Sequence, residues 1–267
     1  MAIVGGYMVP HPPIALAEIG RGEEKKIQAS LDAFGEVARD IAAIKPDTII
    51  VTSPHTVMYR DYFHISPGNH AKGDFGHFRA GQVRMEVDYD RDLVNEIVKI
   101  CQARTFPAGC MGEMDPNLDH GTMVPLYFIN QAYEDYQLVR IGLSGCSLQD
   151  HWMLGTIIRE AVDKLGRKAV FLASGDLSHC QKEEGPYGFR PQGPAYDQKI
   201  MDVMGRGAFE ELLAFRENFL KESMECGHRS FTIMGGALQG KKLTVRKLAH
   251  EATFGVGYGF VIYHCAE

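Results

Sequence analysis

Short strand-like runs rich in hydrophobic residues recur along the chain and give the first indication of its fold. Many of these residues are Val or Ile, which favour β-strands, and the runs have the length of a buried strand. Six of them predict strands: 2–8, 47–53, 82–89, 137–144, 168–174 and 257–263. Several are apolar nearly throughout, as expected when helices cover both faces of a sheet. A further segment, "GKKLTVRK" at 240–247, alternates basic and apolar residues and predicts a strand with one solvated face.

Longer segments between the strands carry hydrophobic residues every three or four positions, which is the spacing of one helix face. This spacing predicts helices within 23–44, around 93–101 and over 154–165. Gly166 directly follows the last of these, and helices commonly end at a glycine. Strands that alternate with helices predict an α/β fold with a central, largely parallel or mixed β-sheet and helices on both faces.

Two segments, 64–81 and 183–196, are rich in glycine and show no regular spacing of hydrophobic residues. Both contain aromatic residues, and neither is polar enough to mark a boundary between domains. We therefore expect ordered loops at these positions and a single domain over residues 1–267.

Composition and charge narrow the class of protein. The formal net charge of −6 argues against a nucleic-acid or anionic-membrane partner, because those partners bind basic surfaces. No apolar run reaches the ~18–20 residues of a membrane-spanning helix, and the N-terminus lacks the positively charged start of a signal peptide. The six cysteines include no C-x-x-C pair, which is typical of reduced thiols. We therefore expect a cytoplasmic protein with no nucleic-acid or membrane partner.

Histidines lie where the chain leaves the predicted strands. His11, His55 and His179 each come just after an apolar strand, and His120 lies in a loop that enters an apolar helix. Open α/β sheets form their sites at the carboxyl ends of the strands. A structural hydrogen bond explains any one of these histidines, but four at such positions favour a shared site. Prolines beside His11 and His55 restrict both loops, which suits a preformed ligand geometry.

Two neutral imidazoles and one carboxylate on one face of a metal form the facial triad of non-haem Fe(II) proteins, which leaves positions open for substrate and O₂. Glu225 is the candidate carboxylate, because it precedes an apolar, glycine-rich helix that contains no other acid. Two alternatives remain: Glu225 is a surface acid near a helix start, or the neighbouring Cys226 is the third ligand. The histidines and the carboxylate also suit zinc or another divalent metal.

The segment "SGDLSH" places Asp176 and His179 three residues apart, on the turn after the strand at 168–174. The structural explanation is that Asp176 caps a helix and His179 is hydrogen-bonded in a wall. The chemical explanation is that Asp176 orients His179 or tunes its pKa, and that His179 is an acid–base group.

Five short motifs occur in the order "PHPP", "SPH", "LDHGTMVPL", "SGDLSH" and "ECGHRSF". In this order they resemble the class III extradiol ring-cleavage dioxygenases of the protocatechuate 4,5-dioxygenase β-subunit type, and the related Memo family. The resemblance spans nearly the whole chain. It implies a non-haem Fe(II) enzyme that cleaves a catechol or aminophenol ring with O₂.

The same resemblance implies roles for individual residues. His11, His55 and Glu225 match the iron ligands of the dioxygenases. His120 and His179 match residues that line the substrate pocket, and His179 matches the acid–base residue.

Two further positions connect the sequence to the Memo family. Asp176 matches an acid in the "GDxxH" turn of Memo-type proteins. In those proteins a "CG" pair supplies a cysteine ligand, which in this sequence is Cys226. The alternative function is therefore a Memo-like metal-binding protein without ring-cleavage activity.

Two hydrolase classes are weaker alternatives. Three serines follow strands, as a nucleophile would, but the chain has no G-x-S-x-G elbow; they are Ser144, Ser174 and Ser178. A zinc hydrolase would use the same histidines and carboxylate as the iron enzyme.

The expected partners are a small aromatic substrate and O₂, bound in a cleft at the carboxyl edge of the sheet. We expect His120 and the segments 64–81 and 183–196 to border this cleft, because their aromatic residues suit a flat ring. These residues are Phe75, Phe78, Tyr187 and Phe189. We also expect a homo-oligomer, since symmetric assemblies are common among soluble proteins.

Overall fold

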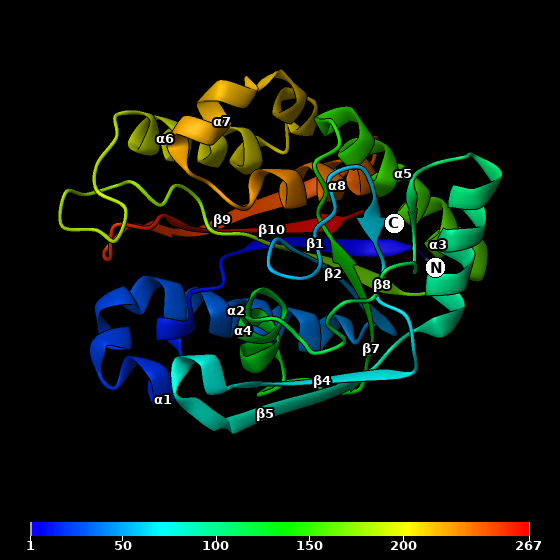
Figure 1. Cartoon of the computed structure of the whole chain (residues 1–267), viewed down its shortest axis with the longest axis horizontal. Coiled ribbons are helices and arrows are strands. Elements are labelled where there is room, and N and C mark those ends of the chain that lie inside the picture. Colours follow the sequence, from blue (N-terminus) through cyan, green and yellow to red (C-terminus); the bar gives the residue numbers. More distant parts are fainter. Residues whose placement is uncertain (1, 267) are drawn as a thin grey trace.

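The structure, a computed structural model, describes residues 2–266 and confirms an α/β fold around a mixed central sheet (Figure 1). The six strands of this sheet lie in the order β7-β2-β8-β1-β10-β9. The first four are parallel, and β10 and β9 are antiparallel. Their bounds are β1 Ile3–Val9, β2 Thr48–Ser53, β7 Gln137–Gly142, β8 Ala169–Ser174, β9 Leu243–Glu251 and β10 Tyr258–Cys265.

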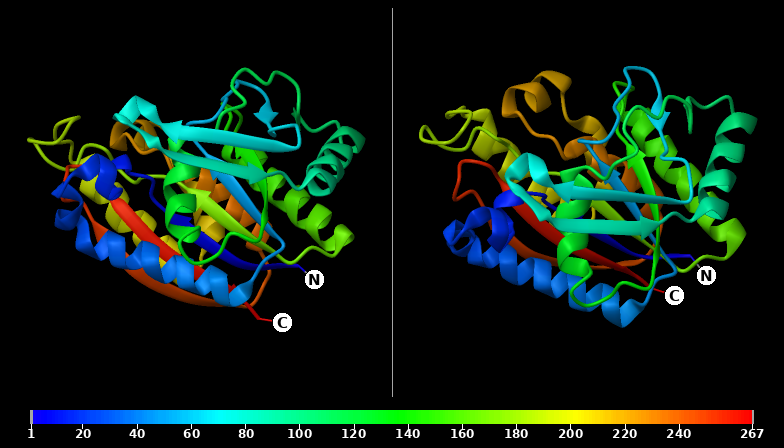
Figure 2. Two further views of the ribbon diagram at one scale, coloured as in Figure 1. Left: turned by 90° about the horizontal axis from the view of Figure 1, so that it is seen from below. Right: turned by 60° about the horizontal axis from the view of Figure 1, so that its bottom comes forward.

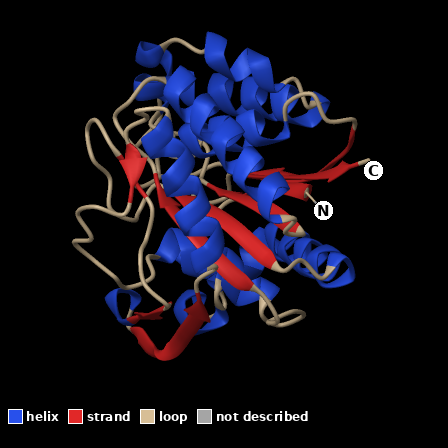
Figure 3. Ribbon diagram, turned by 90° about the vertical axis from the view of Figure 1, so that its right-hand side faces the viewer, coloured by secondary structure: helices blue, strands red, loops and turns tan. Residues whose placement is uncertain are grey.

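Helices cover both faces of the sheet (Figures 1 and 3). One layer contains α3 Arg91–Ala103, α5 Leu148–Leu165, α6 Gln192–Arg206, α7 Glu217–Ser223 and α8 His228–Leu238. The other contains α1 Ala17–Gly20, α2 Gln28–Ile44 and α4 His120–Ile129. Short 3-10 segments connect these elements at Pro13–Ala15, Glu23–Ile27, Gly76–Phe78 and Phe209–Ala214.

The two helix layers explain why the central strands are mostly apolar. In β2, Ile50 belongs to the hydrophobic cluster under α5 and α8, whereas Ile49 and Val51 belong to the cluster under α2 and α4. Alternate side chains of a strand point to opposite faces, so a strand covered on both sides favours apolar residues on both faces. All six residues of β2 and all six of β8 are buried.

The segment predicted as a strand at 82–89 forms a strand but lies outside the central sheet. Strand β5 (Ala80–Asp88) pairs with β4 (His70–Phe75) in a separate antiparallel hairpin that lies over α4 (Figure 2). The expectation of a loop over 64–81 was therefore wrong for most of that segment. Burial alternates along β5, as in a ribbon with one face in solvent. A third small sheet pairs β3 (Phe63–His64) with β6 (Ala108–Gly109).

The second predicted loop, 183–196, is irregular as far as residue 191, and α6 then begins at Gln192. The strand predicted at 240–247 is β9, at one edge of the sheet. None of the helices in the described part of the chain is both long and apolar enough to cross a membrane.

Candidate metal centre

The carboxyl ends of β1, β8 and β2 meet at one edge of the sheet. Strand β8 lies between the other two, with Val9 opposite Ser174 and Thr52 opposite Ala173. The loops after these strands therefore carry His11, His55 and the "SGDLSH" turn into one place, as expected for parallel strands.

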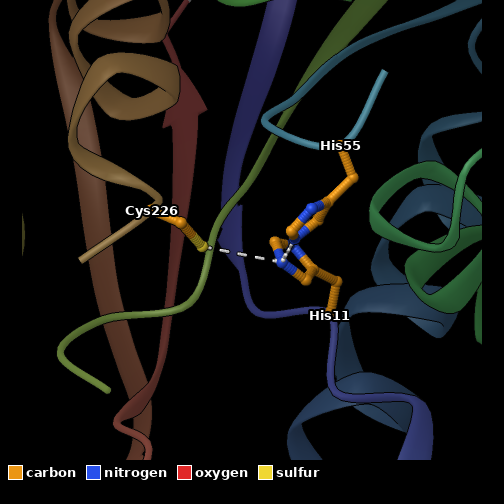
Figure 4. A group of neighbouring side chains, drawn as sticks. All are labelled: His11, His55 and Cys226. Carbon is orange, nitrogen blue, oxygen red and sulfur yellow. Dashed lines mark hydrogen bonds between the residues drawn. The ribbon is translucent and has the colours of Figure 1, made fainter. Parts of the chain in front are cut away.

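Three potential metal ligands converge at this edge (Figure 4). The Nε2 atoms of His11 and His55 are 3.0 Å apart, and the Sγ of Cys226 is 3.7 Å from the Nε2 of His11. Metal bonds of about 2.0–2.1 Å to nitrogen and 2.3 Å to sulfur place neighbouring tetrahedral ligands about 3.3–3.6 Å apart. The three side chains therefore fit one metal ion in both spacing and chemistry.

Cys226 reaches the site because two backbone segments approach closely. A Cβ on Gly175 would lie 2.1 Å from the Cα of Gly227, so only glycine permits this approach. The Cys226 N–H donates to the carbonyl of Asp176 across the same gap, at 3.4 Å. The turn after β8 and the start of α8 are thereby held together.

Glu225 takes a different position from the one expected. Its Oε2 accepts a hydrogen bond of 2.6 Å from the backbone N–H of His228, in the first turn of α8. Free N–H groups at a helix start attract a carboxylate, and this contact engages Glu225 at the start of α8. Within residues 2–266, the group of mutually close ligand atoms contains Cys226 and not Glu225.

Burial keeps the histidines of the site neutral. Burial lowers the pKa of His11 well below its usual range and also lowers that of His55. The pKa of His120 falls to about 4, mainly through burial and then through the charge of His55. Near neutral pH these imidazoles therefore keep the lone pairs that metal binding requires.

His120 lies beside the ligands and faces a cleft. Its ring stacks on His55 with centroids 4.0 Å apart, and Phe78 contacts its edge at 5.3 Å. The cleft has a volume of about 920 Å³ and is lined by His55, His120, Phe78 and residues of the β4–β5 hairpin. Its position beside the ligands agrees with the expected cleft at the carboxyl edge.

Only some of the residues expected to border the cleft do so. Within residues 2–266 the segment 183–196 contributes nothing to this lining, and Phe75 is buried in the core. Tyr187 instead packs against His179, with ring centroids 5.4 Å apart, and is 54% exposed. The hairpin therefore borders the cleft, and the second segment lies next to His179.

His179 and Asp176 do not pair directly as hypothesised. The Nδ1 of His179 lies 2.5 Å from the carbonyl oxygen of Met224, which can only accept, so His179 donates this bond. Asp176 accepts from the backbone N–H of His11 at 2.8 Å. The two side chains interact through charge: burial raises the pKa of Asp176, and nearby His179 partly opposes this.

Sequence reasoning missed two positioning serines at the ends of the buried strands. The Oγ of Ser174, on β8, is 2.9 Å from the Nδ1 of His11. Ser53, on β2, donates to Asp119 and accepts from the backbone N–H of His55. A polar last residue in a buried strand was the available signal.

The burial of the candidate nucleophiles argues against the serine-hydrolase alternative. All three serines that follow strands are completely buried, namely Ser144, Ser174 and Ser178. A nucleophile must reach its substrate, so none of the three is placed for that role.

The fold and the site together define a class: an α/β protein with a two-histidine centre at the carboxyl edge of its sheet. Residues 5–261 match the family described as the catalytic LigB subunit of aromatic ring-opening dioxygenase. Because this match covers nearly the whole chain, the protein belongs to the LigB family. The family expected from the motifs is confirmed, and the particular branch within it stays a prediction.

Three known proteins are similar over almost the whole chain. Protein CA_C1420 of Clostridium acetobutylicum is 39% identical over 97% of this chain, which spans only 57% of that longer relative. The 2-aminophenol 1,6-dioxygenase beta subunit of a Pseudomonas species is 27% identical over 99% of this chain and 95% of its own. The crystal structure of uncharacterized protein JW3007 from Escherichia coli K12 is 14% identical, with a TM-score of 0.61 over 98% of this chain and 99% of that chain. That structure shares the fold.

Proposed function

We propose that this protein is a non-haem Fe(II)-dependent extradiol dioxygenase that opens a catechol or aminophenol-type ring with O₂. The observation that carries this proposal is the convergence of the His11 and His55 imidazoles beside the cleft that His55 and His120 line. Membership of the LigB family and the similarity to a 2-aminophenol dioxygenase subunit support the same reaction class.

His11, His55 and Cys226 would hold the metal beside the cleft, where His55 forms part of the lining. Fe(II) held there would supply the redox chemistry with O₂ that ring opening requires. The rings of His120 and Phe78 line the cleft together with His55. Such surfaces suit a flat aromatic substrate and limit its orientations.

His179 is the proposed acid–base residue. Because its Nδ1–H donates to the Met224 carbonyl, the proton of the neutral ring is on Nδ1 and the lone pair is on Nε2. Nε2 can therefore accept the proton of a phenolic hydroxyl. Both oxygen atoms of O₂ enter the product of an extradiol cleavage, so the proton returns from His179 within the same turnover.

One observation favours a second candidate, a Memo-like metal-binding protein without ring-cleavage activity. The third side chain at the site is Cys226, a soft thiol, where the expected iron triad has a carboxylate. A thiolate ligand is also compatible with zinc and with copper.

Oxygen uptake separates the two candidates. The protein would be purified without oxygen, loaded with Fe(II), and mixed with a panel of catechols and aminophenols. Substrate-dependent uptake with a ring-opened product supports the dioxygenase, and the zinc-loaded protein is the control. Stoichiometric metal binding without uptake for any substrate would instead support the Memo-like protein.

A further inference from the structure

The Oγ of Ser174 lies between a metal ligand and a helix. It is 2.9 Å from the Nδ1 of His11 and 2.5 Å from the carbonyl oxygen of Gly121, in the first turn of α4. Ser174 is completely buried and His11 is 1% exposed. Solvent therefore does not compete for these contacts.

The carbonyl of Gly121 is free to accept because of the sequence of α4. In an α-helix this carbonyl would accept from the N–H four residues later, which here belongs to Pro125. Proline has no N–H, so the helix leaves the Gly121 carbonyl without that partner. Ser174 supplies the missing donor from β8.

The chemistry of the Gly121 carbonyl, the Ser174 hydroxyl and the His11 imidazole determines where the protons between them lie. A carbonyl oxygen only accepts, so the Ser174 hydroxyl proton points at Gly121. The lone pairs of Ser174 then face His11, and the 2.9 Å contact requires a proton on the Nδ1 of His11. A neutral imidazole carries one proton, which leaves the Nε2 of His11 with a lone pair directed at His55 and Cys226.

We infer that Ser174 is a positioning residue that fixes the ring tautomer of His11, so that Nε2 is ready to bind the metal. The inference rests on the metal centre of the proposed function. Hydrogen bonds of this kind orient metal-binding histidines and strengthen metal affinity. His55 offers an internal comparison, because among residues 2–266 its Nδ1 has no hydrogen-bond partner.

Nitrogen NMR of the imidazole rings tests the tautomer directly in the wild-type protein. With ¹⁵N-labelled histidine, His11 is expected to show a protonated Nδ1 and an unprotonated Nε2. The reverse assignment for His11 would overturn the inference without requiring any variant to fold. In Ser174→Ala, the His11 signals should move toward a mixture of both tautomers, while those of His55 should change little.

Zinc binding gives a second readout, with Zn²⁺ as the probe in competition with a chelating dye. Ser174→Ala should weaken binding by about 10–100-fold, the usual effect of losing such a partner. Ser174→Thr keeps the hydroxyl and should recover most of the affinity. Equal zinc affinity in Ser174→Ala and the wild type would contradict the inference.

Ser230→Ala is the matched control, since Ser230 is also a completely buried serine and donates to the Thr52 carbonyl without touching a ligand. An equal loss of zinc affinity in this control would mean that general loosening causes the effect, and the inference would fail. Neither readout uses oxygen chemistry. A protein that cleaves no catechol but shows the Ser174 effect would refute the dioxygenase and leave the positioning role standing.

Discussion

The three candidate ligand side chains are each positioned by a different contact. Ser174 holds the ring of His11, and Asp176 holds its backbone N–H. Ser53 accepts from the backbone N–H of His55, and the Cys226 N–H donates to a carbonyl. Such contacts reduce the freedom of the ligands before a metal binds, which favours metal affinity and a defined geometry.

His179 lies near His11 but, within residues 2–266, is not among the side chains whose ligand atoms lie close together. Replacing it therefore tests the acid–base role separately from metal binding. His179→Ala should keep the wild-type iron content and lose roughly 10²–10⁴-fold in turnover, the usual contribution of one acid–base group. His11→Ala should lose metal and activity together. Iron stoichiometry and oxygen uptake of both variants check this, and loss of iron from His179→Ala would make His179 a ligand.

Cys226 and Glu225 are neighbours in sequence, but their substitutions should change zinc affinity to different extents. Cys226→Ala should weaken zinc binding by more than about 100-fold, since direct ligands matter more than their partners. Glu225→Gln should leave affinity within about twofold, because an amide oxygen still accepts from the His228 N–H. Dye competition on both variants measures this, and the opposite order would restore Glu225 as the third ligand.

At the scale of elements, helices α5 and α8 lie in direct backbone contact. A Cβ on Gly155 would be 2.0 Å from the carbonyl oxygen of Ile233, and one on Gly236 would be 2.1 Å from that of Trp152. The glycines let α8 lie close to α5, and α8 begins just after Cys226. This packing therefore sets the position of Cys226, the third candidate ligand.

Gly155→Ala should destabilise the fold by about 2–3 kcal/mol, because the added methyl group meets backbone that cannot move aside. Gly35→Ala in α2 is the matched control: its Cβ would meet only the flexible end of Arg39, at 3.3 Å. There the change should stabilise by about 0.5–1 kcal/mol through helix propensity. Urea unfolding measures both, and similar effects of the two changes would contradict the close packing.

At the scale of the whole molecule, the two hydrophobic layers and the buried polar groups determine stability. His151 in α5 is completely buried, with its Nδ1 2.8 Å from the Ser147 carbonyl. Burial lowers its pKa to about 4. Between pH 4 and about 6.5 the unfolded chain therefore binds a proton that the folded protein does not bind.

The contribution of His151 to the free energy of unfolding should therefore rise between pH 4 and about 6.5. It is lost as the pH falls through the same range. The difference amounts to on the order of 3 kcal/mol at most, since one pKa unit corresponds to about 1.4 kcal/mol. Other buried groups titrate too, so the measurement compares the pH dependence of the unfolding free energy in the wild type and in His151→Gln. Identical slopes would contradict the prediction.

The oligomeric state and the cellular location of the protein stay predictions. The relative from Pseudomonas is named as a beta subunit, and protein CA_C1420 is considerably longer than this chain. The homo-oligomer and the cytoplasmic location were expected from general frequency and from the cysteines. Size measurement in solution addresses the first of these.

Local patterns in the sequence were enough to predict the α/β fold, the central strands and the four histidines near one edge. A strand buried on both faces favours apolar residues on both faces, and parallel strands end at a common edge, so both features follow from neighbouring residues. The hairpin of β4 and β5 could not be separated from the central sheet in this way, because strand pairing depends on distant residues.

The choice between Glu225 and Cys226 was also left to the tertiary structure. Adjacent residues point in different directions, and the direction depends on where α8 begins and how closely Gly227 approaches Gly175. The partnership of Ser174 with His11 and Gly121 joins three segments that are remote in sequence. Composition and spacing identify which residues can take part in the chemistry, whereas packing decides which atoms meet.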